Sequence, residues 1–435
     1  MAMETVMDQR MYVEVEGLVD LNVLSAGVYY GCMGLPQELV DQVMDVLYDD
    51  LQTLRACSLT CRAMFASTRR LIHQTLHLTR REYHEGYILL GSEPENIAGL
   101  NFVSYVAECD LLRYTRRIHI HDSCNFTPGT MLPHLHHFQS LDRVHALTIE
   151  GYHAITWANH HNPLFTHLRH TLTSLTLSHP FGHCQLVVQF VLQFPNLENL
   201  CLEQPRGQHI GQYVVIPVII DQFPPLRGHL RLVGPEAGLV GLRLIEFTRE
   251  LGKEINFRSV EIEDCLCPPR ILNDCASTIE DLIIAPDWFG TRRRLPLLLA
   301  AKWLTSVLPT GYDQLRDFNF RDIAGLRRLT LRTAFTPDYG LAFSFTPIST
   351  ITSPVFREFV LEVDGIPSNC DGTNMRPWGR WGETDTLIAE RVVKDGDFRF
   401  TIRTGKLHRP ERFRMQARWF FPLAARSGCI HFETS

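Results

Sequence analysis

Hydrophobic and polar positions follow a helical period in one early stretch of this chain. Leu35, Leu39, Val43 and Leu47 recur every four residues, and Gln, Glu and Asp residues fill the opposite face. This spacing predicts an amphipathic helix with a single apolar stripe. Pro36 suits its first turn, because a residue at that position needs no N–H for an intrahelical hydrogen bond.

Two more short helices are predicted directly after the first. Asp49 or Asp50 can cap a second helix that carries Leu51 and Leu54, and a third helix is expected to begin near Cys61. A unit of three short helices removes too little apolar surface from water to be stable alone. The remaining apolar stripe must therefore contact either the rest of the chain or a partner protein.

The same stretch contains a set of short motifs. They are Leu35-Pro36-x-Glu38-Leu39, the pair Val43-Met44, Leu47, Leu54 and Cys57-Ser58-Leu59-x-Cys61-Arg62. Together they resemble the F-box, and the Cys-Ser-Leu-x-Cys-Arg ending resembles the version common in mushroom-forming fungi. The resemblance covers about a tenth of the chain. It departs from the family at Met64, where the family usually has Trp, although the flexible Met side chain can fill the same pocket.

The resemblance implies that residues 34–79 bind a Skp-type adaptor, which joins F-box proteins to a cullin–RING ubiquitin ligase. The adaptor-binding residues it implies are Leu35, Pro36, Glu38, Leu39, Val43, Met44, Leu47, Leu51, Leu54, Cys57, Leu59, Cys61, Arg62, Met64 and Phe65. Stable docking needs about 1,600 Å² of buried surface in total, so Leu35, Leu39, Val43, Leu47 and Leu54 are expected to be partly exposed in the free chain. The alternative is an ordinary helical hairpin inside a larger core.

After this stretch the pattern changes to a recurring apolar-x-apolar triplet. The triplets begin at Leu76, Ile118, Leu147, Leu175, Leu200, Leu230, Val260, Leu282, Leu329 and Phe359. From Ile118 to Leu282 successive triplets are 22 to 30 residues apart, and several have Leu or Ile three residues upstream. This combination is typical of leucine-rich repeats, in which short strands stack in parallel along a curved solenoid.

The segments between triplets must return the chain to the start of the next strand. Residues 184–194, 238–251 and 294–308 have the composition of return helices. The spacing is unequal, and the consensus Asn after each strand is missing, so the predicted solenoid is irregular. The alternative is a mixed α/β domain in which the triplets recur by chance.

The predicted fold class is therefore α/β (α+β), with a three-helix F-box followed by an irregular solenoid of short parallel strands. Residues 1–33 are interpreted as a weakly ordered leader, with a short strand over 12–16, and residues 34–79 as the helical unit. The solenoid is assigned to residues 80–366. Residues 367–435 are assigned to a C-terminal cap and tail, with a helix over 386–393 and an edge strand over 398–402.

Composition narrows the class of protein. The net charge of −6 gives no electrostatic reason to expect nucleic-acid binding. The longest apolar runs, 214–220 and 295–308, are interrupted and too short to span a bilayer, so no membrane association is expected. The N-terminus lacks the apolar run of a secretory signal, and the twelve cysteines are scattered. Cytoplasm or nucleus, with reduced thiols, is the expected location.

No motif for catalysis is present. Thirteen histidines lie between His119 and His183, and stacked repeats could bring His119 near His145 or Leu147. Their spacing matches no zinc signature, so they are interpreted as polar surface residues, with a pH-sensitive binding face as the alternative. Cys265, Cys267 and Cys275 contain no Cys-x-x-Cys pair. No catalytic residue, cofactor or metal is therefore predicted.

The resemblance and the repeats together imply a substrate-recognition adaptor of a ubiquitin ligase. Residues 34–79 would bind the Skp-type adaptor, and the repeats would bind an unidentified protein target. A second possibility is an F-box scaffold without a role in ubiquitination. The third is a metal-dependent enzyme built on the histidine-rich region.

Overall fold

The structure, a computed structural model, describes sixteen segments of the chain. They are 36–48, 50–60, 62–79, 88–89, 112–120, 141–150, 163–178, 184–203, 225–263, 265, 268–285, 319–334, 346–364, 382–394, 396–404 and 410–434.

Three helices open the described chain: α1 (Gln37–Val46), α2 (Leu51–Ser58) and α3 (Arg62–Ile72). Pro36 is the residue just before α1. The Asp50 carboxylate caps α2 by accepting a hydrogen bond of 3.0 Å from the backbone N–H of Thr53. The three predicted helices are therefore present, with the second one capped by Asp50. We refer to α1, α2 and α3 as the three-helix unit.

Thirteen strands follow within the described residues. They are β1 (Thr75–Thr79), β2 (Ile88–Leu89), β3 (Arg117–Ile120), β4 (Ala146–Glu150), β5 (Ser174–Ser178), β6 (Asn199–Glu203), β7 (Leu226–Val233), β8 (Ile255–Glu263), β9 (Asp281–Ala285), β10 (Arg328–Ala334), β11 (Glu358–Asp364), β12 (Arg399–Thr404) and β13 (Ile430–Thr434). All ten apolar triplets lie in these strands. The prediction of strands at the triplets is confirmed.

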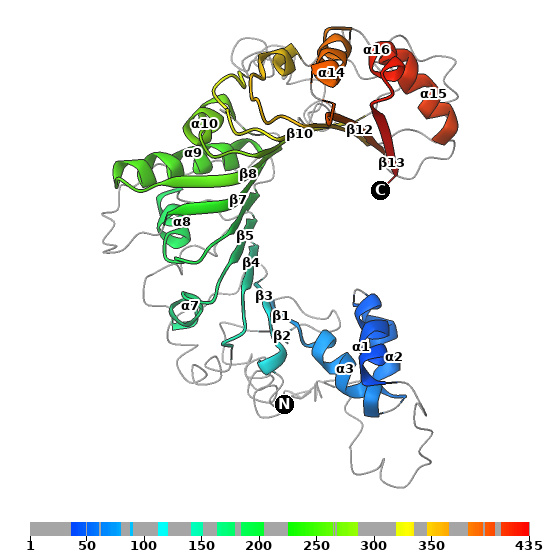
Figure 1. Ribbon diagram of the computed structural model, residues 1–435. Coiled ribbons are helices and arrows are strands. Elements are labelled where there is room, and N and C mark those ends of the chain that lie inside the picture. Colours follow the sequence, from blue (N-terminus) through cyan, green and yellow to red (C-terminus); the bar gives the residue numbers. More distant parts are fainter. Residues whose placement is uncertain are drawn as a thin grey trace, which may run out of the picture.

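The strands form a single sheet in which every recorded pair is parallel. From β3 to β13 the order in the sheet follows the order in the chain, and β1 lies between β3 and β2. The sheet lines the inner side of an open arc, the helices that follow β2 lie outside it, and α1, α2 and α3 lie at one end of the arc (Figure 1). The arc is therefore a mixed helix-and-strand architecture built on one curved parallel sheet.

The outer layer consists of helices and short turns. They are η3 (Leu112–Tyr114), α7 (Pro163–Leu168), α8 (Cys184–Val191), α9 (Pro235–Glu250), α10 (Pro268–Cys275), η6 (Thr346–Thr350), α14 (Gly382–Lys394), α15 (Pro410–Phe420) and α16 (Pro422–Arg426). Two of the predicted return helices correspond to α8 and α9, and the predicted helix over 386–393 corresponds to α14. The third return helix, over 294–308, lies outside the described residues, as does the leader with its strand over 12–16.

The period of two within each strand decides which side chains enter the core. In β5, Leu175 and Leu177 are fully buried, while Ser174 and Thr176 point to the other face and stay partly exposed. The apolar members of successive strands join the apolar faces of the outer helices in one continuous cluster that extends from Leu76 to Cys429. This core accounts for the Leu and Ile residues of the triplets.

Successive strands begin with the same backbone hydrogen bonds. The N–H groups of Thr173 and Ser174, for example, both donate to the carbonyl of His145, at 2.9 Å each. One of these close approaches requires a glycine. Gly228 has φ of +85°, and a Cβ atom there would lie 2.1 Å from the carbonyl oxygen of Glu198. The sheet has a register shift at this point, between β7 and β8.

The sheet extends past both of its predicted limits. β1 belongs to the sheet although it lies inside 34–79, and β12 and β13 continue the sheet inside the region assigned to a cap. The prediction of an edge strand over 398–402 is wrong, because β12 pairs with β11 on one side and β13 on the other. The cause is the alternation of Ile430 and Phe432, which gives the last segment the pattern of one more strand.

Candidate functional site

The three-helix unit has a small core of its own. Val40, Met44 and Leu54 are almost completely buried, and they form a cluster separate from the core of the sheet. Partly buried side chains surround this cluster; they are Leu47, Cys57, Met64, Leu71 and Ile72. Helix α1 therefore packs through Val40 and Met44 and not through the stripe defined by Leu39 and Val43.

Polar contacts fix α1 against α3. The Asp41 carboxylate accepts hydrogen bonds from the Ser67 hydroxyl at 2.5 Å and from the Gln37 amide at 3.0 Å. These two bonds lower the pKa of Asp41, since both stabilise the charged carboxylate. Arg70 and Asp45 form an ion pair of 2.6 Å between the same helices. The orientation of α1 is thus set by its buried and polar sides together.

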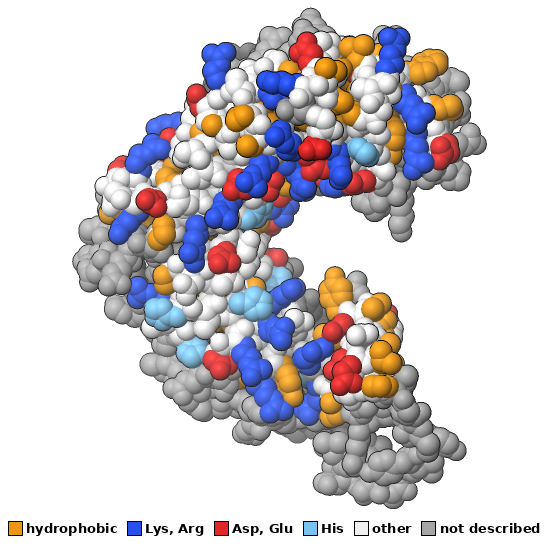
Figure 2. All heavy atoms as spheres, viewed as in Figure 1, with side chains coloured by type: hydrophobic (Ala, Val, Ile, Leu, Met, Phe, Trp, Pro, Cys, Tyr) orange, Lys and Arg blue, Asp and Glu red, His pale blue; other side chains and the backbone are white. Residues whose placement is uncertain are grey.

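The side of α1 that faces away from α3 and the small core is apolar. Leu39, Val43 and Val46 are 44%, 53% and 77% exposed, and their spacing places them along one stripe of the helix. Tyr48 after α1 and Leu59 after α2 are also exposed. Figure 2 shows hydrophobic side chains on the surface of this unit. We call Leu39, Val43 and Val46 the outer apolar stripe.

The structure separates the residues that the F-box resemblance implies into three groups. Pro36, Glu38, Leu39, Val43 and Leu59 are exposed; Leu47, Cys57, Met64 and Phe65 are half-buried; Met44 and Leu54 are buried in the unit. The expectation that Leu54 is partly exposed is wrong, because Leu54 closes the small core together with Val40. Leu35 and Cys61 lie outside the described residues, and no side-chain environment is described for Leu51 and Arg62.

A short joint connects α3 to the first strand of the sheet. The backbone carbonyl of Gln74 accepts hydrogen bonds from the N–H groups of Arg116 and Arg117, at 2.8 and 3.0 Å. The adjacent His73 is partly buried, and burial together with the charge of Arg69 lowers its pKa to about 4. His73 is therefore neutral at physiological pH.

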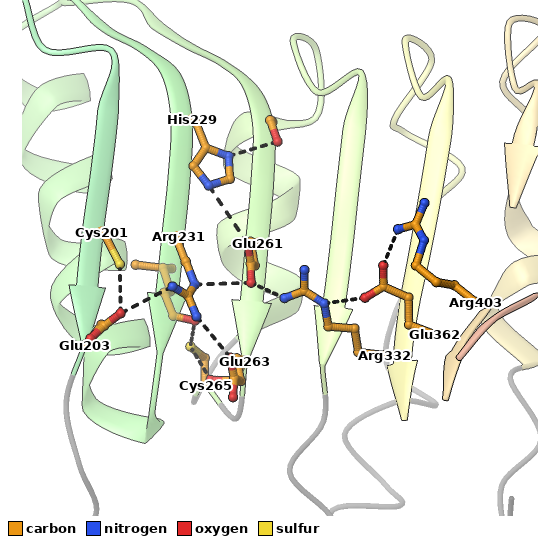
Figure 3. Close-up of polar contacts among 12 residues, drawn as sticks. Cys201, Glu203, His229, Arg231, Glu261, Glu263, Cys265, Arg332, Glu362 and Arg403 are labelled. Atoms are coloured by element: carbon orange, nitrogen blue, oxygen red, sulfur yellow. Dashed lines mark hydrogen bonds and ion pairs between the residues drawn. The ribbon is translucent and has the colours of Figure 1, made fainter. Parts of the chain in front are cut away.

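The inner face of the sheet carries a row of alternating charges across its C-terminal half. We call it the charge ladder: Arg231 on β7, Glu261 on β8, Arg332 on β10, Glu362 on β11, Arg403 on β12 and Glu433 on β13. Figure 3 shows the first five of these side chains, from Arg231 to Arg403, pointing toward one another across the strands, and Figure 2 shows charged side chains along the inner rim of the arc.

Glu261 is the most buried member of the ladder, with its side chain 8% exposed. One of its oxygens lies 3.2 Å from Nε of Arg231 and also accepts a short hydrogen bond from Arg332. Arg332 reaches it across β9, which lies between β8 and β10 in the sheet. Glu261 therefore joins the two arginines that lie on either side of β9.

Carboxylates outnumber guanidinium groups near Arg231. Besides Glu261, Arg231 contacts Glu203 at 3.4 Å and Glu263 at 3.6 Å. Burial lowers and the surrounding carboxylates raise the pKa of Arg231, with a net increase, so this guanidinium stays charged. Burial raises the pKa of Glu263, and Arg231 opposes that effect. Burial lowers the pKa of Arg332 and the bond to Glu362 raises it, again with a net increase. The bonds to Glu433 and Glu362 raise the pKa of Arg403 as well, so the ladder carries three permanent positive charges.

The thiol beside the ladder has no nucleophilic character. Burial and the neighbouring Glu203 raise the pKa of Cys201 to about 12, so its thiolate is scarce at neutral pH. No group of three or more His, Cys, Asp or Glu residues within the described segments could hold a metal ion. Of the notable histidines, His119 pairs with Glu150 at 3.0 Å and lies opposite Thr148. The histidine groups at 134–137, 160–161 and 179–183 lie outside the described residues.

The charge ladder was not predicted from the sequence, although the residues within and next to the triplets contain a signal for it. Arg231 and Glu261 are the middle residues of two triplets, while Arg332 and Glu362 directly follow two others. Within each of the three Arg–Glu pairs, 231 and 261, 332 and 362, and 403 and 433, the sign changes over a step of 30 residues, which matches one repeat. Aligning the residues that flank the apolar positions, and not only the apolar positions, would have found it.

Comparison with known proteins gives no assignment. No family model matches the chain, and a search of curated proteins finds no significant match. None of the described helices is long and apolar enough to cross a membrane.

Proposed function

We propose that the chain is a substrate-recognition adaptor of the F-box class, with an irregular leucine-rich-repeat array behind the three-helix unit. The observation that carries the proposal is the outer apolar stripe. Leu39, Val43 and Val46 are exposed, although the adjacent face of the same helix packs into the small core through Val40 and Met44. Apolar side chains aligned in this way on a surface are typical of a protein interface.

The separation of the two cores supports the proposal. The small cluster around Met44 does not merge with the core of the sheet, so the unit can present its stripe without disturbing the repeats. In this role the stripe would bind a Skp-type adaptor in the cytoplasm or nucleus. The chain itself would carry out no catalytic step, since ubiquitin transfer belongs to other subunits of such a ligase.

The inner face of the sheet would hold the protein target. Its charged side chains already bond with one another, so few rotamers remain to be fixed when a partner binds. A face of paired charges also favours selectivity over raw affinity. The proposal thus assigns adaptor binding to the outer apolar stripe and target binding to the inner face of the sheet.

The test is co-expression of the chain with a Skp-type adaptor, followed by affinity capture. Val43→Glu places a charge in the stripe and should abolish capture, while thermal unfolding of the chain stays unchanged. The matched control is Val393→Glu on α14, where the side chain is 86% exposed and lies at the other end of the arc. Equal capture of both variants, or of neither, would contradict the proposal.

A scaffold without a role in ubiquitination uses the same stripe. The two functions differ in whether a cullin is captured together with the adaptor. Capture of the cullin by the unaltered chain, and its loss with Val43→Glu, supports the ligase. Capture of the adaptor without the cullin supports the scaffold.

A further inference from the structure

Among the described strands, β13 at one end of the sheet is paired along one edge only. β13 pairs with β12 through Phe400 and Ile430 up to Thr404 and Thr434, and no described strand lies on its other side. An edge strand presents unpaired N–H and C=O groups, which makes it a site where another strand can be added. The side chains of β11, β12 and β13 indicate which residues such an added strand would need.

At this edge, the last carboxylate of the charge ladder, Glu433, bonds to an arginine on one side only among the described residues. Glu362, inside the ladder, bonds on both sides, to Arg332 at 2.6 Å and to Arg403 at 2.5 Å, and its side chain is 16% exposed. Glu433 bonds through one oxygen, Oε2, to the guanidinium of Arg403 at 2.8 and 3.1 Å, and its side chain is 46% exposed. Within the described residues, the other oxygen of Glu433 has no partner. Glu362 therefore shows how Glu433 would be completed: by a basic side chain from the next strand.

A groove runs beside the same edge. It has a volume of about 340 Å³, with β13 on one side and α15 on the other. Its lining residues are Glu411, Arg414, Met415, Arg418, Ile430, His431 and Phe432. Met415 is 61% exposed, although it faces Ile430 and Phe432 across the groove. Arg414 is paired with Glu411 at 2.8 Å. The groove thus offers apolar contacts next to open backbone groups.

We propose that this edge binds an extended peptide of a partner protein as one more parallel strand, with the pattern apolar-x-apolar-Lys/Arg. The two apolar side chains would lie beside Ile430 and Phe432, under Met415, and the basic side chain would lie beside Glu433. β12 has this pattern in Phe400-Thr401-Ile402-Arg403, and it already pairs with Glu-bearing strands on both sides. The site shares Glu433 with the inner face proposed for the target, but its backbone edge and groove lie outside that face, and it does not depend on either proposed partner.

The first experiment measures charge preference at Glu433 by fluorescence anisotropy on the full chain. The probe is a labelled peptide with the sequence of β12, Arg-Phe-Thr-Ile-Arg-Thr, and the matched peptide has Glu in place of its second Arg. The Arg peptide should bind about fivefold tighter or more, and the difference should shrink at high salt. Glu433→Gln should remove the preference, and Glu433→Lys should reverse it. Thermal unfolding of each variant verifies that the sheet is intact.

The second experiment locates the peptide by hydrogen exchange. Amides of β13 should become protected on binding, while those of β2, at the opposite end of the sheet, should not change. Met415→Lys should weaken binding at least fivefold, and Val393→Lys should leave it unchanged. Lack of binding by a monomeric chain, or protection away from β13, would overturn the proposal. A chain that sedimentation shows to be a dimer with β13 already protected would also overturn it, because the occupant would then be a second copy.

Discussion

The sheet and the three-helix unit differ in how completely they bury their apolar side chains. In the sheet, the apolar positions of the triplets, such as Leu175 and Leu177, are sealed between strands and outer helices. In the three-helix unit, Val40 and Met44 are buried while Leu39, Val43 and Val46 remain outside. Both parts use amphipathic elements, but only the sheet stacks enough of them to bury the apolar positions of its triplets.

The contrast shows what repetition contributes. The apolar side chains of each strand pack beside those of the next strand and against the outer helices, so the core grows with every repeat. Three short helices have no such neighbours, and the stripe of Leu39, Val43 and Val46 remains exposed. The sheet instead leaves its inner face polar, where charged residues pair with one another. The two parts should therefore respond differently to the same kind of substitution.

The largest expected effect is the loss of a side chain from the sheet core. Leu177→Ala removes a fully buried side chain between neighbouring strands and leaves a cavity. The free energy of unfolding should fall by about 2–5 kcal/mol. Denaturant unfolding checks this value, and capture of the Skp-type adaptor by the variant below its unfolding temperature should be unchanged. Loss of adaptor capture from a folded variant would show that the two parts are not separate.

Much of this contrast could be predicted from the sequence, because apolar periodicity reports which faces are buried. The ten triplets identified strands correctly, since a three-residue alternation recurring once per repeat leaves few other structures. The period of α1 was found as well, but not which of its apolar residues faces inward. Leu39 and Val40 are adjacent and both apolar, so the choice between them depends on where α2 and α3 pack.

The charges on the inner face could not be predicted in the same way. Burial of Arg231 and Glu261 is favourable only because parallel pairing places them side by side, which no single repeat reveals. The last strand was missed for a related reason. Residues 430–434 lack a Leu-rich signature, and Phe432 and Ile430 form a strand because β12 offers a neighbour.

The second effect concerns the joint between the two parts. The pKa of His73 is about 4 in the folded protein, against an ordinary value of 6.5, so between these values the unfolded chain binds a proton that the folded chain does not. The free energy of unfolding should therefore fall by about 2–3 kcal/mol as the pH decreases from 6.5 to 4, and not change further from this group below 4. His73→Gln should remove this part of the pH dependence.

Denaturant unfolding of both proteins at several pH values provides the measurement. The difference between the unaltered chain and His73→Gln isolates the contribution of this imidazole from that of other titrating groups. A difference that does not vary between pH 6.5 and 4 would show that the imidazole is solvated, and that the joint is looser than the hydrogen bonds to Gln74 indicate.

The third effect tests the outer stripe. Leu39→Ala removes a side chain that is 44% exposed, so the free energy of unfolding should change by less than about 0.5 kcal/mol. If the proposed adaptor buries this residue at the centre of the interface, binding should weaken by about 2 kcal/mol or more, roughly thirtyfold. Titration calorimetry with the adaptor and thermal unfolding provide the two values. Unfolding of the whole chain by this substitution would contradict the two-part description.

The smallest expected effect distinguishes the interior of the charge ladder from isolated ion pairs. Glu261→Gln removes the charge shared by Arg231 and Arg332, but each arginine keeps other carboxylates, Glu203 and Glu263 for the first and Glu362 for the second. The loss in the free energy of unfolding should therefore be about 1 kcal/mol, less than for a charge left without any partner.

The matched control for this substitution is Glu358→Gln. Glu358 bonds Arg328 at 2.6 Å, and that guanidinium is 52% exposed, so water can replace the lost partner. Its effect should stay below about 0.5 kcal/mol. Equal effects of Glu261→Gln and Glu358→Gln would mean that the ladder is a set of independent surface pairs. A larger effect at Glu261 means that the inner face is held as one network, because this single carboxylate on β8 joins Arg231 on β7 to Arg332 on β10.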